Sequence, residues 1–98
     1  MKKYCFDIDG TICTNTDGDY ESAEPYLQRI KQINSLHENN NTIILFTARG
    51  TTSGIDWMDI TIKQLTEWGV NYDKLLFGKP EADFFIDDKA TDLFNWFD

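Results

Sequence analysis

The sequence predicts an α/β fold with an open parallel sheet in a single domain over residues 1–98. Short apolar runs alternate along the chain with longer segments whose apolar residues recur at helical spacing. Residues that favour turns separate the two kinds of segment. This alternation is typical of parallel strands joined by helical crossovers, a class in which ligands bind beyond the carboxyl ends of the strands.

Four short runs are the predicted strands, over residues 3–8, 42–47, 74–77 and 83–86. The run at 42–47 (TIILFT) is apolar without alternation, as expected of a strand that is covered on both faces of a parallel sheet. The first run ends at Gly10, and the polar residues 14–24 that follow have the composition of a loop. We therefore expect the second strand to lie inside the sheet.

Two longer segments predict helices that each bury one face. The first covers residues 25–38, where Pro25 suits the first turn and the three Asn residues at 39–41 end the pattern. The second begins after Asp56, whose side chain suits an N-cap, and ends at Gly69. A short last helix is expected over residues 90–97.

The composition excludes several classes of protein. The 98 residues include 9 Lys and Arg against 17 Asp and Glu, a net charge of −8, with 41% hydrophobic residues. This is enough apolar material for a packed core, and the negative charge disfavours nucleic-acid and anionic-membrane partners. No apolar run approaches the ~20 residues that span a bilayer. Asp7 and Asp9 interrupt the first apolar stretch before it could serve as a signal peptide, so we expect a cytoplasmic protein.

The two cysteines, Cys5 and Cys13, lack the paired spacing of a redox or zinc site. Two thiols are also too few for a disulfide framework. We expect both to be free thiols, one of them packed within a strand.

Polar side chains follow the carboxyl ends of all four predicted strands: Asp7 and Asp9, then Thr47, then Lys79, then Asp87 and Asp88. Because these ends meet at one edge of a parallel sheet, we expect the side chains to converge. Several carboxylates in one cleft repel each other unless a cation compensates, which predicts a hard divalent metal, by default Mg²⁺. A hydroxyl and an ammonium facing that metal suit the oxygens of a phosphoryl group.

Four segments resemble the motifs of the haloacid dehalogenase superfamily, in the family's order and over nearly the whole chain: residues 6–12 (FDIDGTI), 45–49 (LFTAR), 79–80 (KP) and 85–89 (FIDDK). The resemblance implies a three-layer, Rossmann-like open parallel sheet of about four strands. The stretches after the first motif and before the third are too short for the cap domain that many members carry, so we expect a capless member. The FTAR and FGKP stretches look most similar to small phosphatase-like proteins of capsule and lipopolysaccharide sugar biosynthesis.

The resemblance implies a Mg²⁺-dependent phosphomonoester hydrolase that forms an aspartyl-phosphate. Asp7 would be the nucleophile, and Asp9 would act first as general acid and then as general base. Thr47 and Lys79 would contact the phosphoryl oxygens. The whole expected phosphate- or substrate-binding set is Gly10, Thr11, Thr47, Ala48, Arg49 and Lys79.

The implied metal ligands are the Asp7 carboxylate, the Asp9 backbone carbonyl and Asp88, with waters completing the octahedron. We prefer Asp88 to Asp87 because Asp88 and Asp92 together fit the paired carboxylates of the fourth motif. Asp92 is then a supporting residue, and Asp87 orients Lys79 or supports the ligands.

The expected substrate is a sugar phosphate or a small phosphorylated metabolite of polysaccharide biosynthesis. The loops at 15–20 and 49–54 are the best placed to meet the leaving group, and Arg49 is assigned either a substrate contact or a supporting role. A sheet of four strands is one fewer than the usual family core, which leaves an exposed edge and a homo-oligomer open.

Three alternatives use the same residues differently. Asp7 and Asp9 with Gly10 could form an acidic turn, and Asp87 and Asp88 a helix N-cap. A receiver-like phosphoacceptor also combines Asp, Thr, Lys and Mg²⁺, but its acceptor follows a middle strand, where this chain has Thr47. A non-catalytic binding or assembly subunit could retain the fold and the metal.

Overall fold

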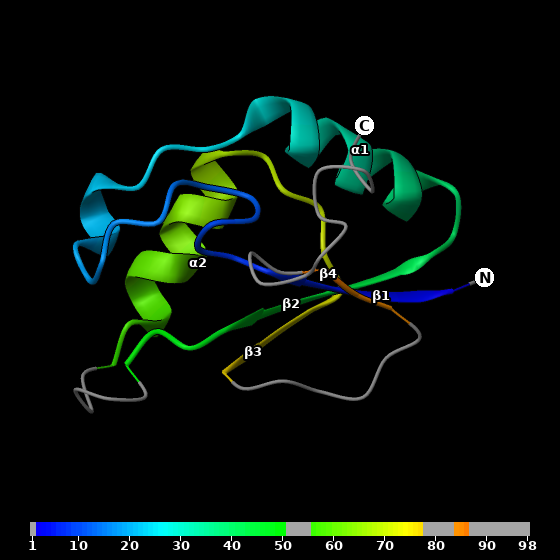
Figure 1. Ribbon diagram of the computed structural model, residues 1–98. Helices are drawn as coiled ribbons and strands as arrows, with labels where there is room; N and C mark the ends of the chain where they lie inside the picture. Colours follow the sequence, from blue (N-terminus) through cyan, green and yellow to red (C-terminus); the bar gives the residue numbers. More distant parts are fainter. Residues whose placement is uncertain (1, 51–55, 78–83, 87–98) are drawn as a thin grey trace.

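The computed structural model describes residues 2–50, 56–77 and 84–86. Over these ranges the element order is β1 (Lys3–Asp7), η1 (Tyr20–Ser22), α1 (Leu27–Glu38), β2 (Thr42–Thr47), α2 (Met58–Glu67), β3 (Lys74–Phe77) and β4 (Phe84–Ile86). The strands form an open sheet in the order β3-β2-β1-β4, and every pairing is parallel (Figure 1). The predicted α/β class with an open parallel sheet is confirmed.

The strand order reverses at β1. From β1 the chain steps outward to β2 and β3 on one side, whereas β4 pairs on the other side, with Phe6 opposite Ile86. In open α/β sheets the ligand crevice lies outside the carboxyl ends of the strands, next to such a reversal. Because β1 ends at Asp7, this carboxylate stands at that position.

The core explains why β2 is apolar along its whole length. Ile43 and Leu45 belong to the large cluster that includes residues of both helices, while Ile44 and Phe46 belong to a second cluster with Cys5. Successive side chains of a strand point to opposite faces, so β2 buries both of its faces. It also pairs on both sides, with β1 and β3, and the predicted internal position of this strand is confirmed.

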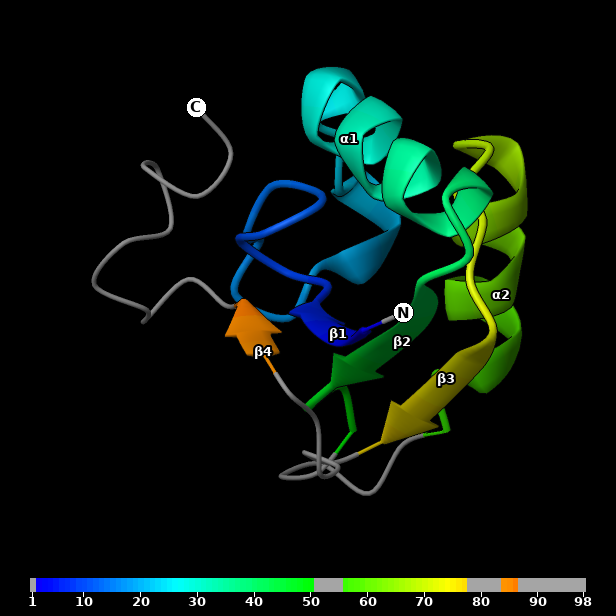
Figure 2. The ribbon, with the colours of Figure 1, turned by 90° about the vertical axis from the view of Figure 1, so that its right-hand side faces the viewer.

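Both helices cover the same face of the sheet (Figure 2). Ile30 and Ile33 of α1 and Leu65 of α2 share one core cluster with the strand residues Phe6 and Leu45. The described residues thus supply the sheet and one helical layer. The helix predicted over residues 90–97, which the expected third layer requires, lies outside the described residues.

Two predicted helix starts differ from the structure. The helix α1 begins at Leu27 instead of Pro25, because Pro25 forms a bridge with Cys13 and the Tyr26 N–H donates to the Ile12 carbonyl at 2.8 Å. These contacts tie the start of α1 to the loop after β1.

In α2 the N-cap is Trp57, one residue after the predicted Asp56. Asp56 still acts at this helix end, because its carboxylate accepts a hydrogen bond from the Met58 N–H at 2.9 Å. Neither α1 nor α2, the α-helices of the described ranges, is long and apolar enough to cross a membrane.

Candidate active site

A cavity of about 380 Å³ lies at the carboxyl edge of the sheet, beside the ends of β1 and β2. It is lined by Asp7 and Asp9 after β1, by Ala48 and Arg49 after β2, and by Asn15, Asp17, Gly18 and Tyr20. The structure therefore brings the first two sequence motifs together with the loop at 15–20. Three carboxylates and one guanidinium line this cavity, which makes it acidic.

Asp7 lies half-buried at the last position of β1. One of its carboxylate oxygens, Oδ1, accepts a hydrogen bond from the Ile8 N–H at 2.8 Å. Ile8 is fully buried and belongs to the large core cluster. The Asp7 carboxylate is thus hydrogen-bonded to the backbone of a residue, Ile8, whose side chain packs in the core.

Asp9 meets Arg49 in a bidentate ion pair. Arg49 donates from Nε to Oδ2 at 2.9 Å and from Nη2 to Oδ1 at 2.8 Å. The Arg49 side chain is 0% exposed and that of Asp9 is 16% exposed. Planar fork-to-carboxylate pairing is the geometry in which Arg recognises a carboxylate most strongly.

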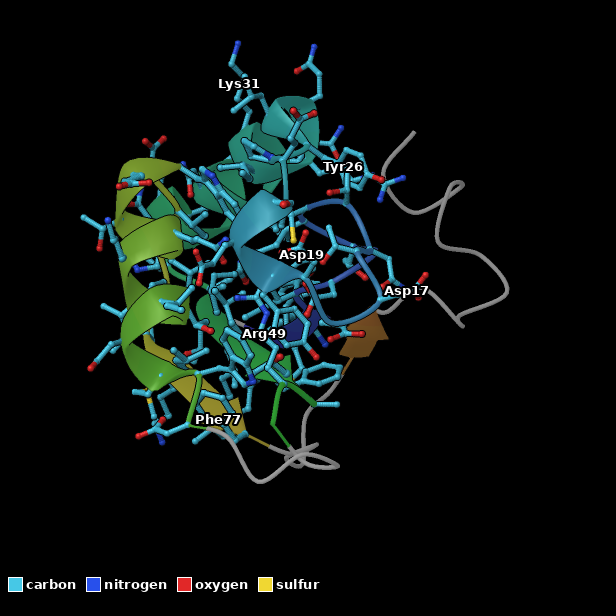
Figure 3. The ribbon with its side chains drawn as sticks, turned by 90° about the vertical axis from the view of Figure 1, so that its left-hand side faces the viewer. Asp17, Asp19, Tyr26, Lys31, Arg49 and Phe77 are labelled. Atoms are coloured by element: carbon cyan, nitrogen blue, oxygen red, sulfur yellow. The ribbon has the colours of Figure 1, made fainter. Side chains whose placement is uncertain are left out.

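Arg49 itself is held by contacts to several elements. Its Nη1 donates to Thr61 Oγ1 at 3.0 Å and to Gln64 Oε1 at 2.7 Å, both on α2. Its guanidinium lies over the ring of Tyr20, 4.6 Å from the centroid, and Gln64 in turn donates to the Tyr20 carbonyl. Figure 3 shows Arg49 inside the molecule beside η1, with Asp17 at the outer bend of the preceding loop.

Thr47 ends β2 and is 1% exposed. Its hydroxyl oxygen accepts a hydrogen bond from the Arg49 N–H at 3.0 Å, so the hydroxyl proton remains for a further acceptor. Ala48, between these two residues, is exposed and lines the cavity. At the end of β2, the Thr47 hydroxyl is therefore buried, whereas the next residue, Ala48, is exposed.

Gly10 and Thr11, expected to bind phosphate, do not line this cavity. The Gly10 N–H donates to the Cys13 carbonyl at 2.8 Å and the Thr11 N–H donates to the Ile8 carbonyl at 3.2 Å. Gly10 has φ of 86°, a conformation that glycine adopts without steric strain. Within the described ranges, the amides of these two residues therefore build the turn that aims Asp9. Thr11 Oγ1 is buried and has no hydrogen-bond partner among the described residues.

Cys13 lies beside Asp9 as a buried thiol. Its Sγ is 3.6 Å from both the Ile8 carbonyl oxygen and Asp9 Oδ1. Burial and, next to it, the negative charge of Asp9 raise the pKa of the Cys13 thiol to about 12. The neutral thiol is therefore a weak donor to the carboxylate. Cys5 is buried as well, and neither cysteine forms a disulfide, as expected.

Sequence reasoning did not identify Thr61, Gln64 and Cys13 as neighbours of the site, and it placed Tyr20 there only as the last residue of the loop at 15–20. Thr61 and Gln64 are three residues apart and both buried, which puts them on one side of α2. Two polar residues on the buried side of a helix were the available signal that this helix contacts a polar site. The contact of Tyr20 with Arg49 had no comparable signal.

Lys79, Asp87, Asp88 and Asp92 lie outside the described residues. Among residues 2–50, 56–77 and 84–86, no group of three His, Cys, Asp or Glu side chains forms a metal site. The half-buried Asp7 carboxylate still supplies the hard oxygen chemistry that Mg²⁺ requires. Asp7 is therefore one oxygen donor of the kind that Mg²⁺ takes. The other expected carboxylate ligand, Asp88, lies outside the described residues.

No protein-family model and no curated protein sequence matches the chain. A crystal structure of a target protein from Vibrio cholerae is similar, with a TM-score of 0.78 and 30% identity over 99% of this chain and 88% of the other. A conserved protein from Bacteroides thetaiotaomicron gives a TM-score of 0.71 and 22% identity over 92% and 78% of the two chains.

A third similar structure is a D,D-heptose 1,7-bisphosphate phosphatase from B. bronchiseptica, complexed with magnesium and phosphate. Its TM-score is 0.60 at 20% identity, over 85% of this chain and 52% of that enzyme. The open parallel sheet and the paired aspartates after β1 define an α/β protein with a Rossmann-like core. The chain has the fold of the haloacid dehalogenase superfamily.

Proposed function

We propose that this protein is a Mg²⁺-dependent phosphomonoester hydrolase that acts through an aspartyl-phosphate on Asp7. The observation that carries this proposal is that Asp7 and Asp9 line the same cavity at the carboxyl end of β1. The two carboxylates have different contacts, because Asp7 accepts from a backbone amide and Asp9 faces a guanidinium. Different surroundings for two carboxylates are what separates a nucleophile from an acid and base.

In the first half-reaction an Asp7 oxygen attacks phosphorus and the bond from phosphorus to the ester oxygen breaks. Asp9 is the anionic partner of Arg49 in the structure, so it first takes up a proton from solvent. It then gives this proton to the departing alkoxide, so that the products are the alcohol and the aspartyl-phosphate. In the second half, Asp9 as carboxylate takes a proton from water, whose oxygen attacks phosphorus. Inorganic phosphate leaves, and both the Asp7 carboxylate and the protonated Asp9 are regenerated.

The remaining residues would position and neutralise the phosphoryl group. Asp7, the Asp9 backbone carbonyl and Asp88 would hold Mg²⁺, which supplies charge stabilisation to the phosphoryl oxygens when it is bound. Thr47 retains a hydroxyl proton that suits a phosphoryl oxygen, and Lys79 would supply an ammonium. Asp92 and Asp87 are assigned supporting roles.

The proposed substrate is a sugar phosphate or a similar small phosphorylated metabolite. A cavity of about 380 Å³ has room for such a molecule. Asn15 and Asp17 supply hydrogen-bonding groups that suit a hydroxyl-rich leaving group. One similar structure is named as a phosphatase of a heptose bisphosphate, which agrees with this class of substrate.

The test is phosphate release by the purified protein from p-nitrophenyl phosphate and from a panel of phosphorylated sugars. We expect release with Mg²⁺ and its loss after chelation with EDTA. The absence of release from every ester in Mg²⁺ would contradict the proposal. A stable acid-quenched phosphoprotein without phosphate release would instead indicate a receiver-like phosphoacceptor.

A further inference from the structure

We propose that Arg49 is a positioning residue that orients the Asp9 carboxylate and stabilises it after Asp9 has given up its proton. This inference rests on the proposed hydrolase function. It gives a role to the buried ion pair between two residues that are 40 positions apart in the chain. The argument depends on how fully Arg49 is committed to protein partners.

Arg49 is poorly suited to the phosphate-binding role that the sequence suggested. Its residue exposure is 2%, and four of its five guanidinium N–H groups donate to protein oxygens: Nε–H, both on Nη1 and one on Nη2. A phosphate contact through these donors would require the ion pair with Asp9 or the contacts to α2 to open. Opening them leaves a charge buried without its partner, which is strongly unfavourable.

The position of the guanidinium is fixed by three separate parts of the chain. Thr61 and Gln64 hold Nη1 from α2, the Tyr20 ring covers one face, and the Arg49 N–H is bonded to Thr47 at the end of β2. Tyr20 also contacts Trp57 edge-on, with ring centroids 4.9 Å apart. A side chain held from several directions can impose a single orientation on its partner.

The bidentate contact matters most when Asp9 is ionised. In the first half-reaction Asp9 passes from acid to carboxylate, and the guanidinium fork stabilises the carboxylate that forms. The benefit grows with the need of the leaving group for a proton. An alkyl phosphate, whose alkoxide is strongly basic, needs this proton, whereas p-nitrophenyl phosphate leaves as a stable phenolate and needs it far less.

The variants that test this role are Arg49→Lys and Arg49→Gln, since neither side chain can form the guanidinium fork. Arg29→Gln is the matched control: Arg29 also lies over a tyrosine ring, that of Tyr26, but donates to the Thr11 carbonyl at 2.9 Å. It therefore supports the same loop without touching Asp9.

We expect both Arg49 variants to lose about 100-fold in kcat on a hexose 6-phosphate and less than about fivefold on p-nitrophenyl phosphate, with KM little changed. Arg29→Gln should leave the ratio between the two substrates unchanged. Equal losses on both esters would overturn the positioning role. So would a raised KM at constant kcat, which is the signature of lost phosphate binding.

A second measurement needs no turnover. In the wild-type protein, ¹⁵N-resolved NMR should show a slowly exchanging Arg49 Nε–H signal, because this proton is buried and hydrogen-bonded to Asp9. We expect that signal to shift strongly in Asp9→Asn and to stay in place in Asp7→Asn. An unchanged signal in Asp9→Asn overturns this inference alone, while a wild-type protein that releases no phosphate overturns the proposed function on which it rests.

Discussion

The two carboxylates after β1 are separated by a single residue but lie in contrasting environments. Asp7 closes the strand and accepts a hydrogen bond from the next backbone amide, while Asp9 sits in the following turn opposite a buried guanidinium. Asp7 belongs to the sheet as the last residue of β1. Asp9 instead contacts Arg49, which in turn contacts α2 and Tyr20. Identical side chains therefore have different contacts, which the surrounding elements determine.

Exchanging the acids for amides should give the largest effect. We expect Asp7→Asn to lose at least about a thousandfold in kcat, because it removes the proposed attacking oxygen anion. Asp9→Asn should lose about 100-fold or more on an alkyl phosphate, because it removes the proposed proton carrier. Steady-state phosphate release measures both.

The same pair of variants also separates the two half-reactions. With p-nitrophenyl phosphate, Asp9→Asn should accumulate an acid-quenched phosphoprotein, because water attack then lacks its base. Asp7→Asn should accumulate none. Intact-protein mass spectrometry distinguishes the two, and circular dichroism controls for folding. Full activity in Asp7→Asn would refute its nucleophilic role.

The two positions should also differ in stability. Asp9→Ala leaves the buried Arg49 guanidinium without its anionic partner, and removal of one member of a buried pair lowers the free energy of unfolding by about 3–5 kcal/mol. Asp7→Ala should change it by less than about 1 kcal/mol. Urea denaturation measures both variants, and equal changes would show that the contrast between the sites is not energetic.

The Cys13 thiol, which lies beside Asp9 and not Asp7, gives a further difference between the two carboxylates. Because the pKa of Cys13 is raised from 9.0 to about 12 in the folded chain, the unfolded state loses this proton first as pH rises. This group therefore contributes a fall in unfolding free energy of about 1.4 kcal/mol per pH unit above pH ~9, continuing until the folded thiol also ionises.

The test of this fall is the difference between wild type and Cys13→Ala. Urea unfolding of both at pH 8 to 10 cancels the titration of the other groups, and the variant should show the shallower decline. Parallel pH profiles of the two proteins would count against a raised pKa at Cys13.

The smallest expected effect concerns the support of Arg49 by α2. Thr61→Val keeps the size of the side chain and removes one of the two acceptors of Nη1, which should lower the free energy of unfolding by about 1.5 kcal/mol. Thr66→Val is the control, since the exposed Thr66 bonds only to the Ile62 carbonyl within α2. A larger effect of Thr66→Val would argue against the network around Arg49.

Much of the fold was predictable because it depends on local patterns. The unbroken apolar run at 42–47 indicated an internal strand, and β2 does bury both faces between β1 and β3. The end of β1 at the acidic pair was also predictable. The start of α1 was not, because Pro25 bonds across the turn to Cys13, a contact that helical propensity does not encode.

The sequence by itself determined the α/β class and the position of Asp7 and Asp9 at the end of the first strand, since hydrophobic spacing and neighbouring residues are local properties. Only the tertiary structure decided what each residue contacts. Arg49 followed a strand and could equally have faced a phosphate, but folding brings it to Asp9 across 40 positions and adds α2 and Tyr20 around it. Burial of its charge requires a partner, and only the arrangement of distant elements selects which one.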